Sequence, residues 1–127
     1  MLPLPVLAIA GLALFLAVAI PAASGQAARW EVPAIVSAGF LAYSLWPVAT
    51  MGPLGFWTEH VRNAWGVQIW FDLLCAIGVG WVLLAPRARA AGLSPWPWLA
   101  LTAATGSIGL LAMLAYVLKN EPAAHPS

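Results

Sequence analysis

Charged side chains are scarce in this sequence. Only 7% of its 127 residues are Asp, Glu, Lys or Arg, and 63% are hydrophobic. A soluble domain of this size carries roughly 25% charged residues, so a water-exposed globular domain is excluded. The net charge of +1 also excludes a basic surface for nucleic acid. The partner that this composition predicts is the lipid bilayer.

Cysteine and histidine are also rare, which removes most metal and haem chemistry. The one cysteine, Cys75, cannot form an intramolecular disulfide or a multi-thiolate zinc or iron–sulfur site. The two histidines, His60 and His125, lie outside the apolar segments, so they cannot ligate a haem between facing spans. We therefore predict no metal and no cofactor.

Long apolar runs are abundant instead. They form four segments of about 20 residues, the length that crosses a hydrocarbon core of roughly 30 Å. The sequence predicts an all-α membrane protein, a four transmembrane helix bundle, as a single integral membrane domain over residues 1–127. The expected spans cover about residues 4–22, 33–48, 64–85 and 95–118. We interpret the first as a retained span rather than a signal peptide, because no Lys or Arg precedes Arg29.

Proline and small residues predict where these helices end and where they pack. Pro47 is expected to bend or end the second span, and the third span is expected to stop at Pro86. Residues 50–62 are too short and polar to cross, so we expect them at the membrane surface. Small residues allow helices to approach closely in lipid, which predicts that the last three spans pack together and the first is peripheral. These residues are Ser37, Gly39, Ser44, Gly78, Gly80, Thr102, Thr105, Gly106, Ser107 and Gly109.

The distribution of Lys and Arg predicts the orientation. In a four-span topology the first and third loops share one side and hold Arg29, Arg87 and Arg89. Arg62 and Lys119 fall on the other side, with both termini. Loops rich in Lys and Arg stay in the cytoplasm, so the prediction is cytoplasmic first and third loops with both termini outside.

Asp72 is the one ionisable side chain inside an expected span other than Cys75 and the tyrosines. A carboxylate in hydrocarbon costs about 2.5 kcal/mol or more, which makes it a candidate functional site. Residues three and four apart share a helix face, so Trp65, Gln68 and Asp72 form one stripe. Asp72 lies about 12 Å inside the third span at 1.5 Å per residue. Its expected partners from elsewhere in the chain are Tyr43, Tyr116 and Arg62.

Short motifs in the second half of the chain carry a resemblance. Trp65 stands seven residues before Asp72-Leu73, and Leu101-Thr102 precedes the segment 106–111, Gly-Ser-Ile-Gly-Leu-Leu. The region resembles small bacterial four-span membrane proteins of unknown function. It is similar, more loosely, to the membrane protein family linked to neoxanthin formation, which has proline at the position of Ser107. The resemblance implies a multi-pass protein of the bacterial inner (plasma) membrane.

Three functions remain open for Asp72. It can be structural, bonding a neighbouring helix of the same bundle. It can belong to a non-enzymatic, lipid-binding site that takes an apolar lipid, a terpenoid or a partner helix of a homo- or hetero-oligomer. This second function is our leading prediction, with Trp65, Gln68, Asp72, Tyr43 and Tyr116 as binding residues. The alternative is an isomerase or cyclase acting on a terpenoid or carotenoid lipid, with Asp72 as its catalytic general acid.

Overall fold

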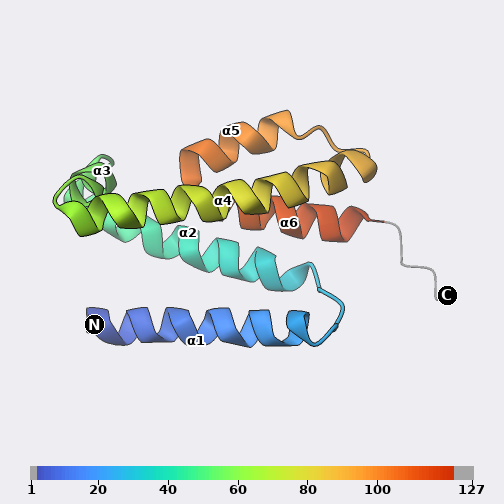
Figure 1. Ribbon diagram of the computed structural model, residues 1–127, viewed down its shortest axis with the longest axis horizontal. Coiled ribbons are helices and arrows are strands. Elements are labelled where there is room, and N and C mark those ends of the chain that lie inside the picture. The colour runs from blue at the N-terminus through green and yellow to red at the C-terminus, as the bar shows by residue number, and fades with distance from the viewer. Residues whose placement is uncertain (1–2, 122–127) are drawn as a thin grey trace.

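A computed structural model describes residues 3–121, and within this range it contains helices and no strand (Figure 1). The helices are α1 (Leu4–Ala23), α2 (Glu31–Met51), α3 (Gly55–His60), α4 (Ala64–Ala90), α5 (Trp96–Thr105) and α6 (Ser107–Asn120). Three of them, α1, α2 and α4, are long and apolar enough to cross a membrane. The all-α membrane class predicted from composition therefore agrees with the structure.

Proline does not end the second and third spans as expected. α2 continues through Pro47 to Met51, and α4 continues through Pro86 to Ala90. The end of α4 is set by Gly92, which has φ +81°, a conformation that favours glycine. The Leu93 N–H then donates to the Ala88 carbonyl at 2.9 Å, and this Schellman geometry satisfies the last carbonyls of the helix.

The structure does not confirm a fourth span over residues 95–118. In its place α5 and α6, of 10 and 14 residues, meet at Gly106 and fold back on each other. Gly106 has φ +66° and ψ −128°, which only glycine adopts without strain. The two helices run antiparallel, since the rings of Trp98 and Tyr116 lie 5.5 Å apart. Each is too short to cross a bilayer alone.

Helix α6 is the centre of the packed part of the molecule, in contact with α2, α4 and α5. Its Met113 and Val117 are fully buried and pack against Leu84 and Ala88 of α4. On the α2 side, the Ser37 hydroxyl donates to the Ile108 carbonyl at 2.8 Å. The prediction that the later apolar segments pack together, with small or polar residues at their contacts, is confirmed here.

Helix α1 stands apart from this core. None of its residues is buried, and none of its Cα atoms lies within 8 Å of a Cα atom of another described helix. It extends beside α2 in Figure 1 without packing on it. The prediction of a peripheral first span is therefore confirmed.

Candidate functional site

The start of α4 is fixed by a close contact with α3. Asn63 caps the helix, its side-chain oxygen accepting from the Gly66 N–H at 2.8 Å, as N-cap residues do. Gly66 lies directly against the end of α3, because a Cβ built there would be 2.5 Å from the Glu59 carbonyl oxygen. This approach holds α3 across the first turn of α4.

An aromatic cluster completes the α3–α4 contact. Trp70 of α4 lies among three rings of α3, with centroid distances of 6.2 Å to Phe56, 5.9 Å to Trp57 and 5.2 Å to His60. Aromatic pairs at these distances and tilts are favourable. Trp70 therefore faces α3. Asp72, two residues further on, lies about 160° away around a helix with 3.6 residues per turn.

A cleft of about 340 Å³ opens at this corner. Within it, Arg62 pairs with Glu59 at 3.1 Å, so the cation that the sequence offered to Asp72 is engaged in its own loop. Asp72 does not line the cleft. The lining residues are Glu59, His60, Arg62, Asn63, Trp65, Gly66 and Ile69.

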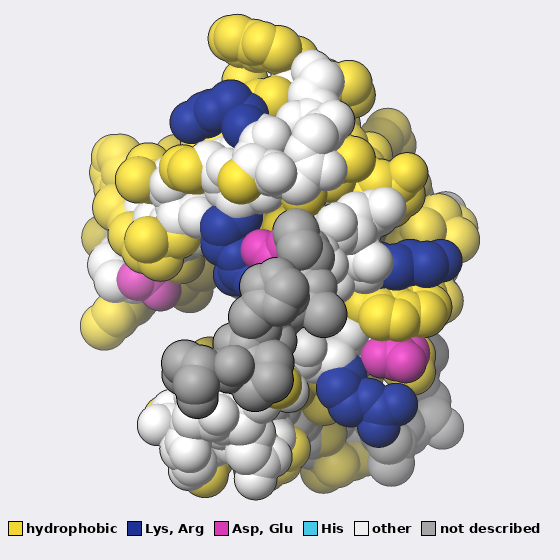
Figure 2. Space-filling view, turned by 90° about the vertical axis from the view of Figure 1, so that its right-hand side faces the viewer, with side chains coloured by type: hydrophobic (Ala, Val, Ile, Leu, Met, Phe, Trp, Pro, Cys, Tyr) yellow, Lys and Arg dark blue, Asp and Glu magenta, His cyan; other side chains and the backbone are white. Residues whose placement is uncertain are grey.

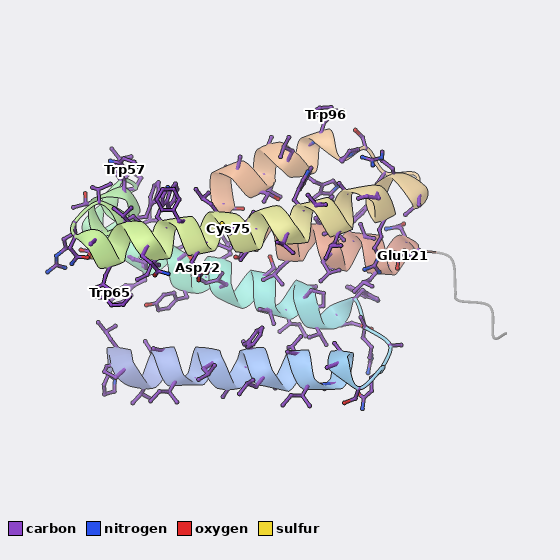
Figure 3. The ribbon with its side chains drawn as sticks, viewed as in Figure 1. Trp57, Trp65, Asp72, Cys75, Trp96 and Glu121 are labelled. Atoms are coloured by element: carbon purple, nitrogen blue, oxygen red, sulfur yellow. The ribbon has the colours of Figure 1, made fainter. Side chains whose placement is uncertain are left out.

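The side of α4 that carries Asp72 is open along most of its length. Trp65 is 76% exposed, and Val79 and Val82 are 62% and 69% exposed. In Figure 3 Trp65 and Asp72 lie along one edge of α4, while Trp57 lies on the other side of that helix. We call this surface the Asp72 face and define it by six exposed residues at alternating spacings of three and four, namely Trp65, Gln68, Asp72, Cys75, Val79 and Val82.

Asp72 has no partner inside the described part of the chain. Its side chain is exposed, and none of the side-chain hydrogen bonds or ion pairs found among residues 3–121 includes it. Sequence periodicity thus placed Trp65, Gln68 and Asp72 correctly on one face. A structural role for Asp72 within the bundle requires a hydrogen bond to a neighbouring helix, and the described part of the chain contains none.

Tyr43 lies at a depth similar to that of Asp72. Ser37 of α2 and Gly80 of α4 both contact the first turn of α6. From that level Tyr43 is six residues further along α2, about 9 Å, and Asp72 is eight residues back along α4, about 12 Å in the same direction. Tyr43 is half-exposed, and its ring lies 6.1 Å from that of Trp46.

Tyr116 lies at the opposite end of the bundle, which corrects its expected position. Because the chain turns back at Gly106, α6 runs parallel to α4, and its end meets the end of α4 where Arg87 pairs with Glu121 at 2.8 Å. Tyr116 is thereby about 20 Å from Asp72 along the bundle axis. The structure therefore does not bring Tyr116 together with Trp65, Gln68 and Asp72.

Comparisons with known proteins add no assignment to this geometry. No family model, curated protein or solved structure matches the chain.

Among residues 3–121, no three His, Cys, Asp or Glu side chains lie close enough together to hold a metal ion. Val82 was not predicted as part of this face, although it follows Val79 by three residues, because only the structure shows that this end of the face stays uncovered.

Proposed function

We propose that this chain is an integral membrane protein that binds a transmembrane helix through the Asp72 face of α4. The observation that carries the proposal is Asp72 itself, an exposed carboxyl with no partner among residues 3–121, on a helix long and apolar enough to span a bilayer. In hydrocarbon such a group costs about 2.5 kcal/mol or more. A second helix that brings hydrogen-bonding groups to that depth removes the cost.

The rest of the chain favours a partner helix over a contact within one molecule. α1 is the helix free to move onto the Asp72 face, but its segment Leu4–Ala23 contains no hydrogen-bonding side chain. Arg62 is paired with Glu59, and Tyr116 is at the other end of the bundle. Tyr43 is on α2, none of whose Cα atoms lies within 8 Å of a Cα atom of α4. The open shape of the face suits a helix, whereas an enzyme for a lipid substrate needs an enclosed apolar pocket around its acid.

Charge supports a location and an orientation for this protein. Lys119 lies over the Trp30 ring, 4.8 Å from its centroid, so the end of α6 sits beside the start of α2. Four of the five cations are then at one end, where Figure 2 shows Lys and Arg side chains spread over the surface. They are Arg29, Arg87, Arg89 and Lys119. We place this end in the cytoplasm of a bacterial cell, with α1, α2 and α4 crossing the inner membrane and α5–α6 entering from the cytoplasmic side.

A photocrosslinker on Cys75, the native cysteine beside Asp72 on this face, tests the function. A maleimide-benzophenone attached there in native membranes is expected to capture a polypeptide, seen as a higher-mass band. The Asp72→Leu variant is expected to lose that band, because the face no longer carries its polar anchor. The matched control is Leu74→Cys in a Cys75→Ala background, which is exposed at a similar depth but rotated by about 100°.

The identity of the cross-linked product distinguishes the candidate functions. A polypeptide adduct at Cys75 that is absent at position 74 supports helix binding. Adducts of bilayer phospholipid alone, equal at positions 74 and 75, contradict it. An adduct of one small apolar molecule, lost in Asp72→Leu, would replace the partner helix with a terpenoid or lipid ligand.

A further inference from the structure

The Asp72 face is complementary to itself. Gln68 offers an amide N–H and an amide oxygen, and Asp72 one turn later offers a carboxyl. These groups can satisfy each other, because an amide N–H donates to a carboxyl oxygen. Within one α4 the two side chains are four residues apart and can share one hydrogen bond, which leaves the second amide N–H, the amide oxygen and a carboxyl oxygen exposed without partners.

Two copies of one protein share the same distribution of cations, four of five at one end, so both insert in the same direction. The α4 helices of two copies therefore run parallel, and each residue meets its counterpart at the same depth. In this arrangement Gln68 of either copy reaches Asp72 of the other, and the two-fold axis generates the second bond from the first. A foreign helix would need polar groups at the same two depths, which a second copy supplies by symmetry.

The dimensions of the face fit such a pair. From Trp65 to Val82 it covers 17 residue steps, about 26 Å, close to the roughly 30 Å of a hydrocarbon core. Its spacing of three and four residues is that of left-handed helix pairs, which are common in membranes. The residues that follow the polar pair along α4, Cys75, Val79 and Val82, are small enough for close approach.

We infer that two copies of this chain associate through their α4 helices along the Asp72 face, with Gln68 and Asp72 hydrogen-bonded across a two-fold axis. Cys75 then lies at the seam, the line along which the two α4 helices meet. This inference rests on the proposed helix-binding function and names its partner. It is specific to the face, since it predicts which positions of α4 meet their own copies and which do not.

The native cysteine allows a direct test with the full chain in membranes. Mild oxidation is expected to join two copies through Cys75, because seam positions bring Cα atoms within the 4–7 Å or so that a disulfide spans. In a Cys75→Ala background, Val79→Cys and Val82→Cys are expected to cross-link as well. Leu74→Cys and Gly78→Cys, exposed but on the flank, are expected not to.

Substitutions at Asp72 test the chemistry of the seam. Asp72→Leu is expected to lower the disulfide-linked fraction about five- to tenfold, the effect of losing two interhelical hydrogen bonds. Asp72→Asn is expected to retain it, since the amide keeps a donor and an acceptor and removes any repulsion between two carboxylates. Gln68→Leu provides a second disruption, and circular dichroism of each variant verifies that the helices still form.

Each outcome bears on the inference. Equal cross-linking at positions 74 and 75, or a Cys75 dimer that Asp72→Leu leaves unchanged, overturns it. If oxidation gives no dimer while the benzophenone on Cys75 captures a different polypeptide, the second copy is wrong and the helix-binding function stands. If the benzophenone reaches only lipid, both fail.

Discussion

At the residue scale, the contact between α5 and α6 depends on Gly109, because any side chain at this position would push the two helices apart. A Cβ built there would lie 2.8 Å from the Thr102 nitrogen and 2.9 Å from the Leu101 carbonyl carbon. Both neighbours are backbone atoms of α5, which cannot rotate away as a side-chain tip can. The tight antiparallel turn between α5 and α6 therefore depends on this glycine.

We expect Gly109→Ala to destabilise the folded state by about 1–3 kcal/mol, the usual cost of overpacking a tight contact. The measurement is reversible unfolding in mixed detergent micelles, followed by circular dichroism. Gly78→Ala is the matched control, because its Cβ would meet nothing within 4 Å, and it should stabilise the folded state by up to about 1 kcal/mol, since alanine favours the helix over glycine. Equal losses for the two variants would contradict the close α5–α6 packing.

The small residues predicted that helices would pack closely, but not which small residues would lie at the contacts. Ser37, Gly80 and Gly109 lie at helix contacts, whereas Gly39 and Gly78 have no neighbour within 4 Å of a built Cβ. A sequence period gives the face of a helix on which a residue lies. It does not give the depth at which another helix crosses that face, and the contact requires both.

At the scale of elements, one ion pair joins the ends of α4 and α6. The Arg87 guanidinium donates to both Glu121 carboxylate oxygens, at 2.8 and 2.9 Å. These hydrogen bonds, helped by the nearby positive charge and opposed by partial burial, hold the pKa of Glu121 below its usual value of 4.5. Since the folded-state pKa is the lower one, the stabilisation is complete above about pH 5 and is lost as the pH falls through the folded-state pKa.

We expect the pair to contribute about 0.5–1 kcal/mol at neutral pH, because both side chains keep contact with water. Glu121→Gln should lower the unfolding free energy by that amount at pH 7, and the difference should shrink as the pH falls below 4.5 through the folded-state pKa of Glu121. The comparison is unfolding in micelles across this pH range. Glu31→Gln serves as the control, since its longer 3.5 Å pair with Arg29 is more exposed; an equal pH dependence in both variants would refute the role of Glu121.

Helix type and approximate position followed from the sequence, but the break in the last apolar segment did not. Residues 95–118 have the hydropathy of a continuous span, and a lone glycine is tolerated inside helices. Gly106 becomes a turn because α5 finds a packing partner in α6. The turn at Gly106 also places Tyr116, 10 residues later in the sequence, far from Asp72. The candidate site therefore lacks one of the residues predicted for it.

At the scale of the whole molecule, the α5–α6 hairpin returns the end of α6 to the end of α4 and the start of α2. A fourth crossing would put Lys119 beside Arg62, dividing the five cations three to two between the sides. With α5 and α6 folded back, Glu121 is paired with Arg87 and Lys119 lies over Trp30. The resulting division of four to one is a stronger orientation signal than the sequence alone contained.

Single cysteines in a Cys75→Ala background test this topology in intact bacterial cells with a membrane-impermeant thiol reagent. We expect Thr58→Cys, on α3, to react. Ser94→Cys and Asn120→Cys should both be protected until the membrane is permeabilised, because the hairpin brings residue 120 back to the side of residue 94. All three positions are exposed in the folded chain, so protection reports the membrane and not burial.

Asn120→Cys is the position that discriminates between the topologies. A four-span protein would place residue 120 with residue 58, so labelling of both, with Ser94→Cys protected, would contradict the hairpin. Labelling of Ser94→Cys and Asn120→Cys without Thr58→Cys would keep the hairpin and reverse the orientation. The expected pattern puts the Asp72 half of α4 in the outer half of the bilayer, where neither α5 nor α6 reaches, and leaves that half of the helix open to a partner.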